Sequence, residues 1–458
     1  MKVIICGAGQ VGFGIAERLS AEGNDVSIID NNGALVQKAN DMLEVRAMAG
    51  NAAHPDVLAR AGAGEADMLI AVTLHDEVNM LACEVANALF DIPTKIARIR
   101  AQTYLDPQWS KLFNREHLAI DYVISPELEV ANAVLTRLER PGALESTEFA
   151  GGRITALGIA CGPECPVIDT PLTQLSDLFP DLPAVTVALV RQGRLFIPHG
   201  KDQIQSGDDA YVIAPTEQVA RTLQIFGHEE TQGRRIVIAG GGNIGLYVAR
   251  RIEESHPNVR AKVIEVSRAR AIEIADKLSR TAVLHGSSLS EDVLREAEAH
   301  VADTVVAVTN DEQVNLLTSA LAKQLGCKSS LCLINSANYA SMIRSLGIDA
   351  QINPRTITTS RVLQHVRRGR IRGVYSILNG AGEFIEAEVL ETAPVLGHPL
   401  KDLVKSDGLR IGAVLRGGKV LMPSGALELE IKDRVVLFAR ADGVKEVEQM
   451  FRVSPEYF

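Results

Sequence analysis

Short apolar runs alternate with amphipathic stretches over the first 140 residues of the chain. In Val11–Ser20 the apolar side chains of Val11, Ile15 and Leu19 recur at helical spacing, which predicts a helix. The apolar runs are short and rich in Val and Ile, as in strands that are buried on both faces. Such strands alternating with helices predict a parallel sheet with right-handed crossovers. The expected strands are Lys2–Cys6, Val26–Ile29, Leu69–Val72 and Lys95–Ile99, and further helices are expected over Val78–Leu89 and Leu128–Leu138.

The pattern changes after Pro141-Gly142, where the apolar runs become separated by frequent turn residues. Gln192-Gly193 and Gly207-Asp208-Asp209 are typical turn sequences between strands. This texture predicts a small domain built around a sheet. Its expected strands are Arg153–Ile159, Ala184–Arg191, Arg194–Ile197 and Ala210–Ala214.

Both kinds of unit occur twice in the chain. KVIICGAGQVG at Lys2–Gly12 is echoed by RIVIAGGGNIG at Arg235–Gly245, and Val187–Ala214 is paralleled by Gly412–Ala439. The sequence therefore predicts a tandem duplication of an α/β unit: two Rossmann-like parallel-sheet domains, each followed by a small α+β domain. The expected domains are 1–140, 141–228, 233–358 and 370–458.

Composition narrows the class of protein. No apolar run approaches the ~20 residues that cross a bilayer, and a net charge of −10 argues against nucleic acid as a partner. Six cysteines are scattered along the chain, which is typical of a reducing cytoplasm. The spacing of Cys161 and Cys165 leaves a metal, a disulfide or neither open. No metal site is predicted.

Each copy carries glycines with the spacing G-x-G-x-x-G, after an expected strand and before an expected helix. In a βαβ unit the first glycine permits the tight turn, the second lets phosphate approach the backbone, and the third lets helix and strand pack closely. The helix N-terminus then offers unpaired N–H groups to the phosphates. We therefore predict a nucleotide site at each loop. The predicted loop residues are Gly7, Ala8, Gly9, Gln10, Val11 and Gly12 in the first copy, and Gly240, Gly241, Gly242, Asn243, Ile244 and Gly245 in the second.

An acidic residue ends the second expected strand of each copy. Asp30 and Glu265 can accept hydrogen bonds from both ribose hydroxyls, and their charge would repel a 2′-phosphate. This favours NAD(H) or an adenine nucleotide over NADP(H). Alternatively each carboxylate caps the following helix, or Glu265 pairs with Arg268 or Arg270.

The carboxyl edge of the expected strands Leu69–Val72 and Lys95–Ile99 carries further candidates. Thr73 and Leu74 follow the first of these strands, and Thr309 follows its counterpart in the second copy, at the edge where open α/β sheets bind ligands. Each threonine begins a segment with Asp or Glu three residues later and Asn six residues later, which helix capping would also explain. Arg98 and Arg100 are placed to reach phosphate, and their counterparts in the second copy are Leu333 and Asn335.

These residues resemble the KTN/RCK nucleotide-binding domains. The resemblance rests on GAGQVG with Asp30, Gly50-Asn51 before a helix, AVT with Asp76 and Asn79, and the ARIR strand. The small domains resemble the companion RCK C-terminal domains, so the domain order covers the whole chain. The family often has Asp where Asn51 and its counterpart Ser287 stand, which leaves the ligand of the second site open.

The resemblance implies a regulator rather than an enzyme. Such proteins bind NAD(H), and in some members ATP or ADP, and assemble as rings of nucleotide-binding domains. The ring docks, as a peripheral subunit on the cytoplasmic side of the bacterial inner membrane, on a potassium transporter of the TrkH/TrkG kind. Four chains would form a homo-tetramer with eight such domains. Leu128–Leu138 and Thr359–Val366 are then either hinge helices or ordinary connections.

Two alternative functions stay open, and one basic patch has two interpretations. An NAD-dependent oxidoreductase needs an acid–base set, and neither His199 nor His365 has an assignable carboxylate partner in the sequence. A stand-alone NADH/NAD redox sensor would use the same sites without turnover. A dense basic patch either contacts anionic lipid or acidic loops of a partner, or is a solvated linker. The patch consists of Arg367, Arg368, Arg370 and Arg372.

Overall fold

The computed structural model of the chain contains four sheets, which alternate between parallel and antiparallel along the sequence. It describes residues 1–114, 117–140, 142–179, 181–229, 233–336, 339–366, 371–403 and 407–452. Pro141, and Arg367, Arg368 and Arg370 of the basic patch, lie outside the described residues. The predicted fold class, two Rossmann-like domains each followed by a small α+β domain, is confirmed.

Each Rossmann-like domain is built on a six-stranded sheet. The strands of the first sheet are β1 (Lys2–Cys6), β2 (Asp25–Asp30), β3 (Arg46–Ala49), β4 (Met68–Ala71), β5 (Thr94–Arg98) and β6 (Tyr122–Ile124). Those of the second are β12 (Arg235–Ala239), β13 (Arg260–Glu265), β14 (Ala282–His285), β15 (Thr304–Ala307), β16 (Ser329–Leu333) and β17 (Ala350–Ile352). The orders are β3-β2-β1-β4-β5-β6 and β14-β13-β12-β15-β16-β17, and the strands are parallel. Strand order therefore reverses beside β1 and beside β12, where open α/β sheets bind ligands.

The two small domains have antiparallel sheets with matching topology. The first contains β7 (Glu145–Phe149), β8 (Ile154–Ala160), β9 (Val185–Arg191), β10 (Arg194–Phe196) and β11 (Asp209–Pro215). The second contains β18 (Ile371–Ile377), β19 (Gly382–Glu388), β20 (Leu409–Arg416), β21 (Lys419–Leu421) and β22 (Arg434–Arg440). Read from their first strands, the orders are β7-β8-β11-β9-β10 and β18-β19-β22-β20-β21. The small domains are therefore duplicates in structure as well as in sequence.

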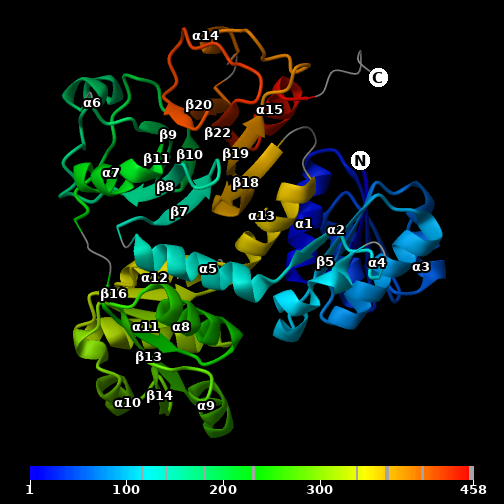
Figure 1. Cartoon of the computed structure of the whole chain (residues 1–458), viewed down its shortest axis with the longest axis horizontal. Helices are drawn as coiled ribbons and strands as arrows, with labels where there is room; N and C mark the ends of the chain where they lie inside the picture. Colours follow the sequence, from blue (N-terminus) through cyan, green and yellow to red (C-terminus); the bar gives the residue numbers. More distant parts are fainter. Residues whose placement is uncertain are drawn as a thin grey trace.

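Helices cover the sheets of both halves (Figure 1). The first Rossmann-like domain contributes α1 (Gln10–Ala21), α2 (Gly33–Met42), α3 (Pro55–Arg60), α4 (Asp76–Phe90) and α5 (Pro126–Glu139). The second contributes α8 (Asn243–Ser255), α9 (Arg268–Ala275), α10 (Glu291–Glu296), α11 (Glu312–Leu325), α12 (Ala340–Ser345) and α13 (Pro354–Val366). The small domains contain α6 (Leu172–Leu178), α7 (Val219–Ile225), α14 (Leu400–Leu403) and α15 (Val444–Met450). Short 3-10 helices span Ala63–Glu65, Gln102–Leu105, Pro107–Phe113, Thr216–Gln218, Ala299–Val301 and Leu378–Gly380.

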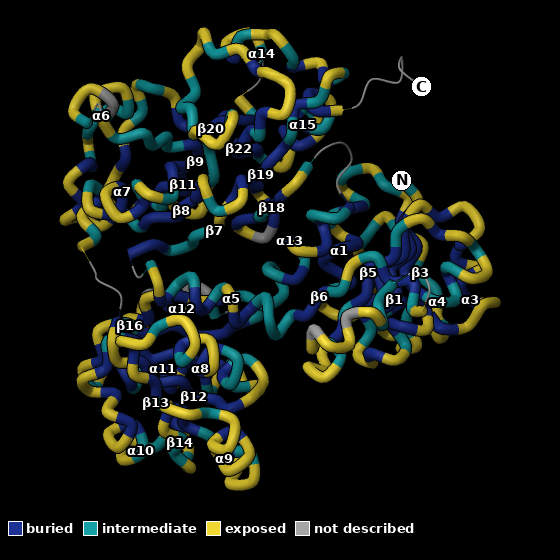
Figure 2. Tube along the Cα trace, viewed as in Figure 1, coloured by how far each residue is buried: buried dark blue, intermediate teal, exposed yellow. Residues whose placement is uncertain are grey.

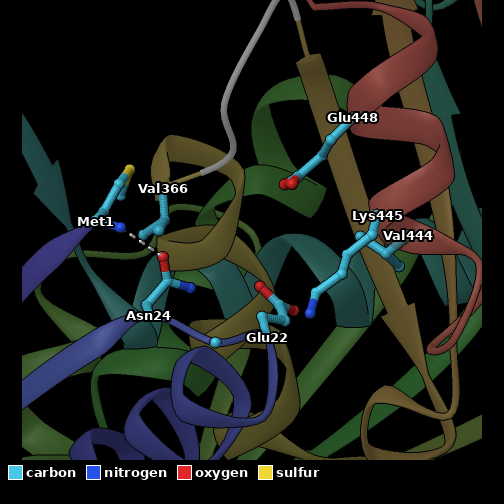
Figure 3. A pocket seen from close by; sticks show the side chains of 8 residues that line it. Met1, Glu22, Asn24, Val366, Val444, Lys445 and Glu448 are labelled. Atoms are coloured by element: carbon cyan, nitrogen blue, oxygen red, sulfur yellow. Dashed lines mark hydrogen bonds between the residues drawn. The ribbon is translucent and has the colours of Figure 1, made fainter.

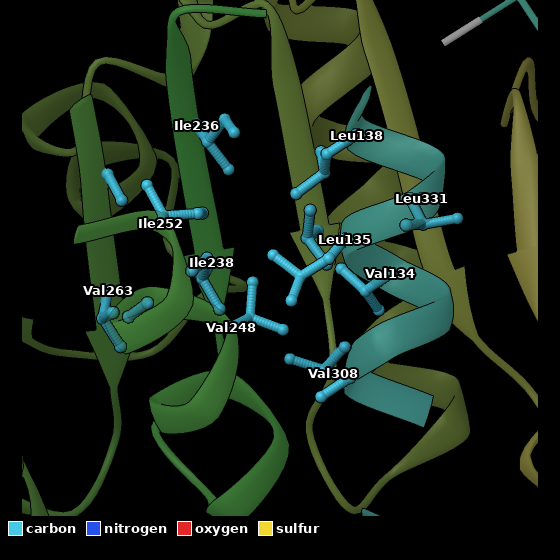
Figure 4. Packing of buried hydrophobic residues seen from close by; sticks show 14 of the residues in the cluster. Val134, Leu135, Leu138, Ile236, Ile238, Val248, Ile252, Val263, Val308 and Leu331 are labelled. Carbon is cyan, nitrogen blue, oxygen red and sulfur yellow. The ribbon is translucent and has the colours of Figure 1, made fainter. Parts of the chain in front are cut away.

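The helix that ends each Rossmann-like domain packs on the other Rossmann-like domain. Figure 1 shows α5 lying across the second domain and α13 lying against α1 of the first. In the second domain's core, Val134, Leu135 and Leu138 of α5 face Ile238 and Val248 (Figure 4). Each buried aliphatic side chain of this size contributes about 1.5–3 kcal/mol, so the exchange joins the two domains firmly.

The reverse contact uses the apolar face of α13. Val362, Leu363 and Val366 are buried in the core of the first domain, together with Val3 and Ile15. An amphipathic helix buries its apolar stripe against other apolar residues. Here α5 does so in the second Rossmann-like domain, and α13 does so in the first. The two folds are therefore linked by two exchanged helices.

The two small domains share one apolar core. The ring centroids of Phe149 and Tyr211 in the first small domain lie 6.4 and 6.0 Å from the ring centroid of Phe384 in the second small domain. A side-chain carbon at Gly412 would lie 2.2 Å from Ile213 Cδ1, so close packing requires glycine there. Figure 2 shows the buried residues running through both small domains.

A second contact joins the first Rossmann-like domain to the second small domain. Figure 3 shows a polar cavity of about 140 Å³ between them, in which Glu22 of the first domain faces Lys445 of α15. Val366 of α13 and Met1 also line it. The first Rossmann-like domain thus contacts α13 and α15 of the second half, and its Arg18 pairs with Glu383 of β19.

Candidate nucleotide-binding sites

The first glycine loop has the conformation that the motif predicts. Gly7 follows β1 with φ +111°, which L side chains rarely adopt, and a side-chain carbon there would lie 3.0 Å from Thr73 N. A side-chain carbon at Gly12 would lie 1.8 Å from the Gly7 carbonyl oxygen. Gly9 faces open space and caps α1 without a side-chain hydrogen bond. The first and third glycines are thus required by packing, whereas the second leaves room for a ligand.

The second loop repeats this geometry. Gly240 also has φ +111°, and a side-chain carbon at Gly245 would lie 1.9 Å from its carbonyl oxygen. Gly242 faces open space at the start of α8. Gly241 stands where the first loop has Ala8, because a side-chain carbon there would lie 2.5 Å from Ile274 Cδ1.

The remaining loop residues form the first turns of α1 and α8. Gln10 and Asn243 are exposed, and Val11 and Ile244 are half-buried. Neither helix has a side-chain cap, so no side chain of the N-cap residue accepts from its first N–H groups. Such an N-terminus, with its partial positive charge, suits phosphate.

The acidic residue of each copy holds the glycine loop. Asp30 accepts hydrogen bonds from Ala8 N at 2.6 Å and Asn32 N at 2.8 Å. Glu265 accepts from Gly241 N and Ser267 N, both at 2.8 Å. The helices that follow are capped by other residues, the side chains of Asn32 and Ser267. Since each carboxylate oxygen has two lone pairs, these bonds leave capacity for a ribose hydroxyl.

The strand-four segments clamp the sheet edge rather than cap a helix. Asn79 accepts from Thr73 N and Oγ1 and donates to Thr73 O and Arg98 O. Asp76 accepts from the backbone N–H groups of Arg100 and Ala101. Neither threonine caps the following helix: α4 is preceded by His75 and has no side-chain cap, and α11 is capped by Asp311.

The second copy repeats the clamp. Asn315 bonds Thr309 and the Leu333 carbonyl, and Glu312 accepts from Asn335 N and Ser336 N. Thr73 and Thr309 therefore lie at equivalent positions beside their glycine loops. Leu74, which follows Thr73, is 75% exposed at this edge.

Arg98 and Arg100 differ in environment. Arg98 donates to the Thr73 carbonyl at 2.7 Å, its Nε is buried without a hydrogen-bond partner, and burial lowers the pKa of its guanidinium. Arg100 forms an ion pair of 2.7 Å with Glu127, in the first turn of α5. Glu127 was not predicted as a partner, because it lies 27 residues after Arg100 and in a separate helix.

The second copy carries its basic group elsewhere. Arg270 in α9 donates to the Gly241 carbonyl at 2.9 Å and pairs with Glu273. Leu35 occupies the equivalent position of α2. In the first copy the positive charge of Arg98 and Arg100 thus lies at the end of β5. In the second copy the positive charge of Arg270 lies beside the glycine loop and Glu265.

Asn51 makes a local turn at the carboxyl end of β3. Its side chain accepts from Ala53 N at 3.0 Å, and its backbone carbonyl accepts from His54 N. Ser287 bonds Leu289 N in the same way in the second copy. Both side chains stand at the edge where the family more often has Asp.

Comparison with known proteins decides the family. The TrkA-N domain model matches residues 3–126 and 236–354, and the TrkA-C domain model matches residues 158–227 and 384–452. The chain belongs to the TrkA family. Proteins named Trk system potassium uptake protein TrkA match over their whole length: that of Azorhizobium caulinodans is 58% identical and that of Halomonas elongata 38% identical, each with 100% of both chains covered.

Solved structures show the same fold at low sequence identity. The GsuK RCK domain superposes with a TM-score of 0.60 at 15% identity, covering 98% of this chain and 94% of that chain. The GsuK channel bound to NAD superposes with a TM-score of 0.60 at 13% identity, covering 98% and 78%. These structures show a shared fold, and the predicted family is confirmed by the domain models and by the relatives of the same name. Within the described ranges, no helix combines the length and apolarity that crossing a membrane requires, and no cluster of three acidic, His or Cys side chains could hold a metal ion.

Proposed function

We propose that the chain is a regulatory subunit that binds NAD(H), or alternatively ATP or ADP, and gates a membrane potassium transporter of the TrkH/TrkG kind. Family membership and the names of its relatives support potassium uptake as the process. The GsuK channel, whose fold is shared, was solved bound to NAD. Asp30 and Glu265, placed beside the glycine loops, favour a nucleotide with a free ribose 2′-hydroxyl.

One observation carries the regulatory part of this proposal. The Arg100–Glu127 ion pair joins the β5 edge of the first domain to α5, whose apolar face is buried in the second domain. Phosphate bound at this edge would compete with Glu127 for the Arg100 guanidinium. Bound nucleotide would thereby weaken the ion pair between Arg100 and α5. Because α5 is buried in the second domain, the angle between the two Rossmann-like domains would change with it.

The energy required is modest. A ligand shifts a conformational equilibrium only by its difference in affinity for the two states. Couplings of about 1–3 kcal/mol, a roughly 5–150-fold change in affinity, are typical. The Arg100 side chain is half exposed, so its pair with Glu127 contributes up to about 1 kcal/mol, the lower end of that range.

We further propose that four chains form a ring of eight Rossmann-like domains, peripheral to the cytoplasmic face of the inner membrane. Leu81 of α4 and Leu317 of α11 occupy equivalent positions and are 51% and 50% exposed. Leu74, which precedes α4, and Leu89, which lies within it, add exposed apolar surface. Exposed apolar surface repeated on both copies supports contacts between chains.

The oxidoreductase alternative gains no support from the described residues. His199 lies 3.9 Å from Asp407, a partner that the sequence did not indicate, and both side chains are exposed far from the glycine loops. His365 stacks on Tyr122 at 3.8 Å, and burial lowers its pKa to about 4. Neither histidine adjoins a nucleotide site.

The proposal is tested by potassium uptake in a bacterial strain that lacks its own subunit. Wild-type protein should restore uptake, and Arg100→Asn, which places the second-copy residue at the edge, should restore it with a weaker nucleotide response. Lys419→Asn, an exposed change in β21 of the second small domain, serves as the control. Full restoration with unchanged nucleotide response in Arg100→Asn would contradict the proposed route.

A further inference from the structure

One face of α1 begins at the first glycine loop and is covered by the second half of the chain. Gln10, Gly14 and Glu17 recur at helical spacing, so they share this face. Gln10 is exposed in the first turn, and Gly14 lies about 6 Å further along the helix axis. Arg355 of α13 lies on the same face, where its Nη2 is 3.7 Å from Glu17 Oε2. A side chain of the second Rossmann-like domain thus lies about one helical turn from the first glycine loop.

The helix that carries Arg355 runs in the same direction as α1. Its first turn lies against the middle of α1, whereas Val366 at its end lies beside Glu22, which follows α1 (Figure 3). His365, in its last turn, stacks on Tyr122 at the start of β6, which is the amino edge of the parallel sheet. The start of α13 therefore points toward the carboxyl edge of the first sheet, where the glycine loop lies.

Gly14 leaves space for the arginine on the surface of α1. A side-chain carbon at Gly14 would lie 3.0 Å from both Nε and Nη2 of Arg355. Glycine in a helix interior destabilises the helix relative to alanine, and α8 has Tyr247 at the equivalent position. The first copy thus has its smallest residue where the guanidinium of the other domain contacts the helix.

The guanidinium of Arg355 is held only loosely. Glu17 is its only ion-pair partner among the residues that the structure describes, and the two side chains are 37% and 59% exposed. A pair of this kind between exposed groups contributes little stability. Since a guanidinium carries five N–H donors, Arg355 keeps donors for a ligand.

The second glycine loop receives no such arginine. Both exchanged helices begin with proline, which aligns Glu127 of α5 with Arg355 of α13. Although α5 packs on α8, the Glu127 carboxylate pairs with Arg100 of its own domain. On α8, Arg250 replaces Glu17. The exchange of helices therefore brings a cation to the first loop and a carboxylate to the second.

We propose that Arg355 is a phosphate-binding residue of the first nucleotide site, supplied by the second half of the chain. This inference rests on the nucleotide binding proposed above for the first loop. The guanidinium fork forms charge-assisted hydrogen bonds with phosphate, whose charge also suits the uncapped start of α1. On binding, Arg355 would leave Glu17 and turn toward Gln10, which needs only the rotation of a partly exposed side chain. Nucleotide at the first loop would thereby hold the start of α13, and with it the second half.

Calorimetric titration of the intact chain with NAD and with ATP tests this role. We expect Arg355→Gln to weaken affinity at the first site about tenfold, as for the loss of one charge-assisted hydrogen bond. Arg361→Gln is the matched control, because it removes the same charge further along α13, where Arg361 pairs with Glu129 at 3.0 Å. Its affinity should stay close to that of the wild type. Thermal unfolding without nucleotide should be nearly unchanged in both variants, since both pairs are partly exposed.

Glu17 distinguishes a ligand contact from a structural ion pair. If Arg355 leaves Glu17 for phosphate, Glu17→Gln removes a competitor and should tighten nucleotide binding. Most of this gain should disappear in the double variant with Arg355→Gln. A pair that only holds the two domains together would shift affinity in the same direction in both single variants.

A Gly9→Ala background assigns the effect to the first loop. Because Gly9→Ala is expected to impair that loop, adding Arg355→Gln should then cause little further loss of affinity. If the wild type binds neither nucleotide, the proposed function fails and this inference fails with it. If the wild type binds, the role of Arg355 alone is overturned by unchanged affinity in Arg355→Gln, by an equal loss in Arg361→Gln, or by weaker binding in Glu17→Gln.

Discussion

Arg18 of α1 and Glu383 of β19 form an ion pair of 2.7 Å between the first Rossmann-like domain and the second small domain. The Glu383 side chain is fully buried and that of Arg18 is 15% exposed. The duplicate positions lack this pair: Arg251 bonds Glu254 on its own helix, and Thr155 bonds Thr216. The link therefore ties one nucleotide domain, and not its duplicate, to a small domain of the other half.

Arg18→Ala should destabilise this contact by roughly 3–5 kcal/mol, because it removes the cation that pairs with the buried Glu383 carboxylate, to which Ser376 Oγ also donates. Calorimetric unfolding should show a lower midpoint for the variant. Glu383→Thr, which installs the first-copy residue, should cost less, and the double variant should be more stable than Arg18→Ala alone. A double variant with strictly additive losses would mean that the pair contributes nothing as a pair.

Gly12→Ala and Gly9→Ala should separate folding from binding at the first loop. Gly12→Ala places a carbon 1.8 Å from the Gly7 carbonyl and should lower stability by about 1–3 kcal/mol or more. Gly9→Ala meets no atom within 4 Å, so thermal unfolding should be nearly unchanged while nucleotide affinity falls tenfold or more, about 1.4 kcal/mol. Unchanged affinity in a folded Gly9→Ala protein would argue against phosphate at this loop.

Arg98→Leu with Arg100→Asn converts the β5 edge of the first copy into that of the second. If phosphate binds there, the double variant should lose affinity at the first site by an amount that shrinks as salt concentration rises, because the lost interaction is between charges. Arg270→Leu, which installs the first-copy residue in the second copy, is the matched control. If the double variant and Arg270→Leu lost the same affinity at the first site, the arginines at the β5 edge would not be the phosphate contacts of that site.

Glu145 should make stability depend on pH. Burial raises the pKa of this carboxyl from 4.5 to about 7, opposed by Arg137 and assisted by Asp209. Because the folded pKa is the higher one, the folded protein holds an extra proton between these values. Its contribution is fully present below about pH 4.5 and is lost as pH rises through about 7, at a cost of roughly 3 kcal/mol.

Thermal unfolding of Glu145→Gln measures this contribution. The amide cannot ionise, so the variant should lose less stability than the wild type between pH 5 and pH 8. Glu217→Gln, an exposed change in the same small domain, should keep the wild-type dependence. Identical pH profiles for wild type and Glu145→Gln would show that folding does not change the pKa of this carboxyl.

Local chemistry explains why much of the site was predictable. A positive φ after a strand and a close helix–strand approach can be met only by glycine, so Gly7 and Gly12 reveal their backbone geometry in sequence. The duplication supported this prediction, because Gly240 and Gly245 have the same backbone geometry. Asp30 and Glu265 were predicted from their position at the end of the second strand, although their hydrogen bonds from the loop N–H groups were not.

Contacts between distant segments were not predictable in the same way. The apolar stripe of α5 predicts a buried face but does not say which sheet covers it, since both duplicates offer similar surfaces. The spacing of Asp76 after Thr73 fits a helix cap, yet Asp76 binds the backbone after β5, 24 residues away. Strands β3 and β6 were missed because they are short and mostly not buried.

The central claim is that the glycine loops bind nucleotide, and calorimetric titration of the purified protein with NAD, NADH, ATP and ADP tests it most directly. We predict binding of at least one of them at one or two sites per chain, with affinity markedly weakened by Asp30→Ala and less by Glu265→Ala. A preference for NAD or NADH would make redox state the signal, and a preference for ATP or ADP would make energy charge the signal. No binding of any of the four, or undiminished affinity in both variants, would contradict the account.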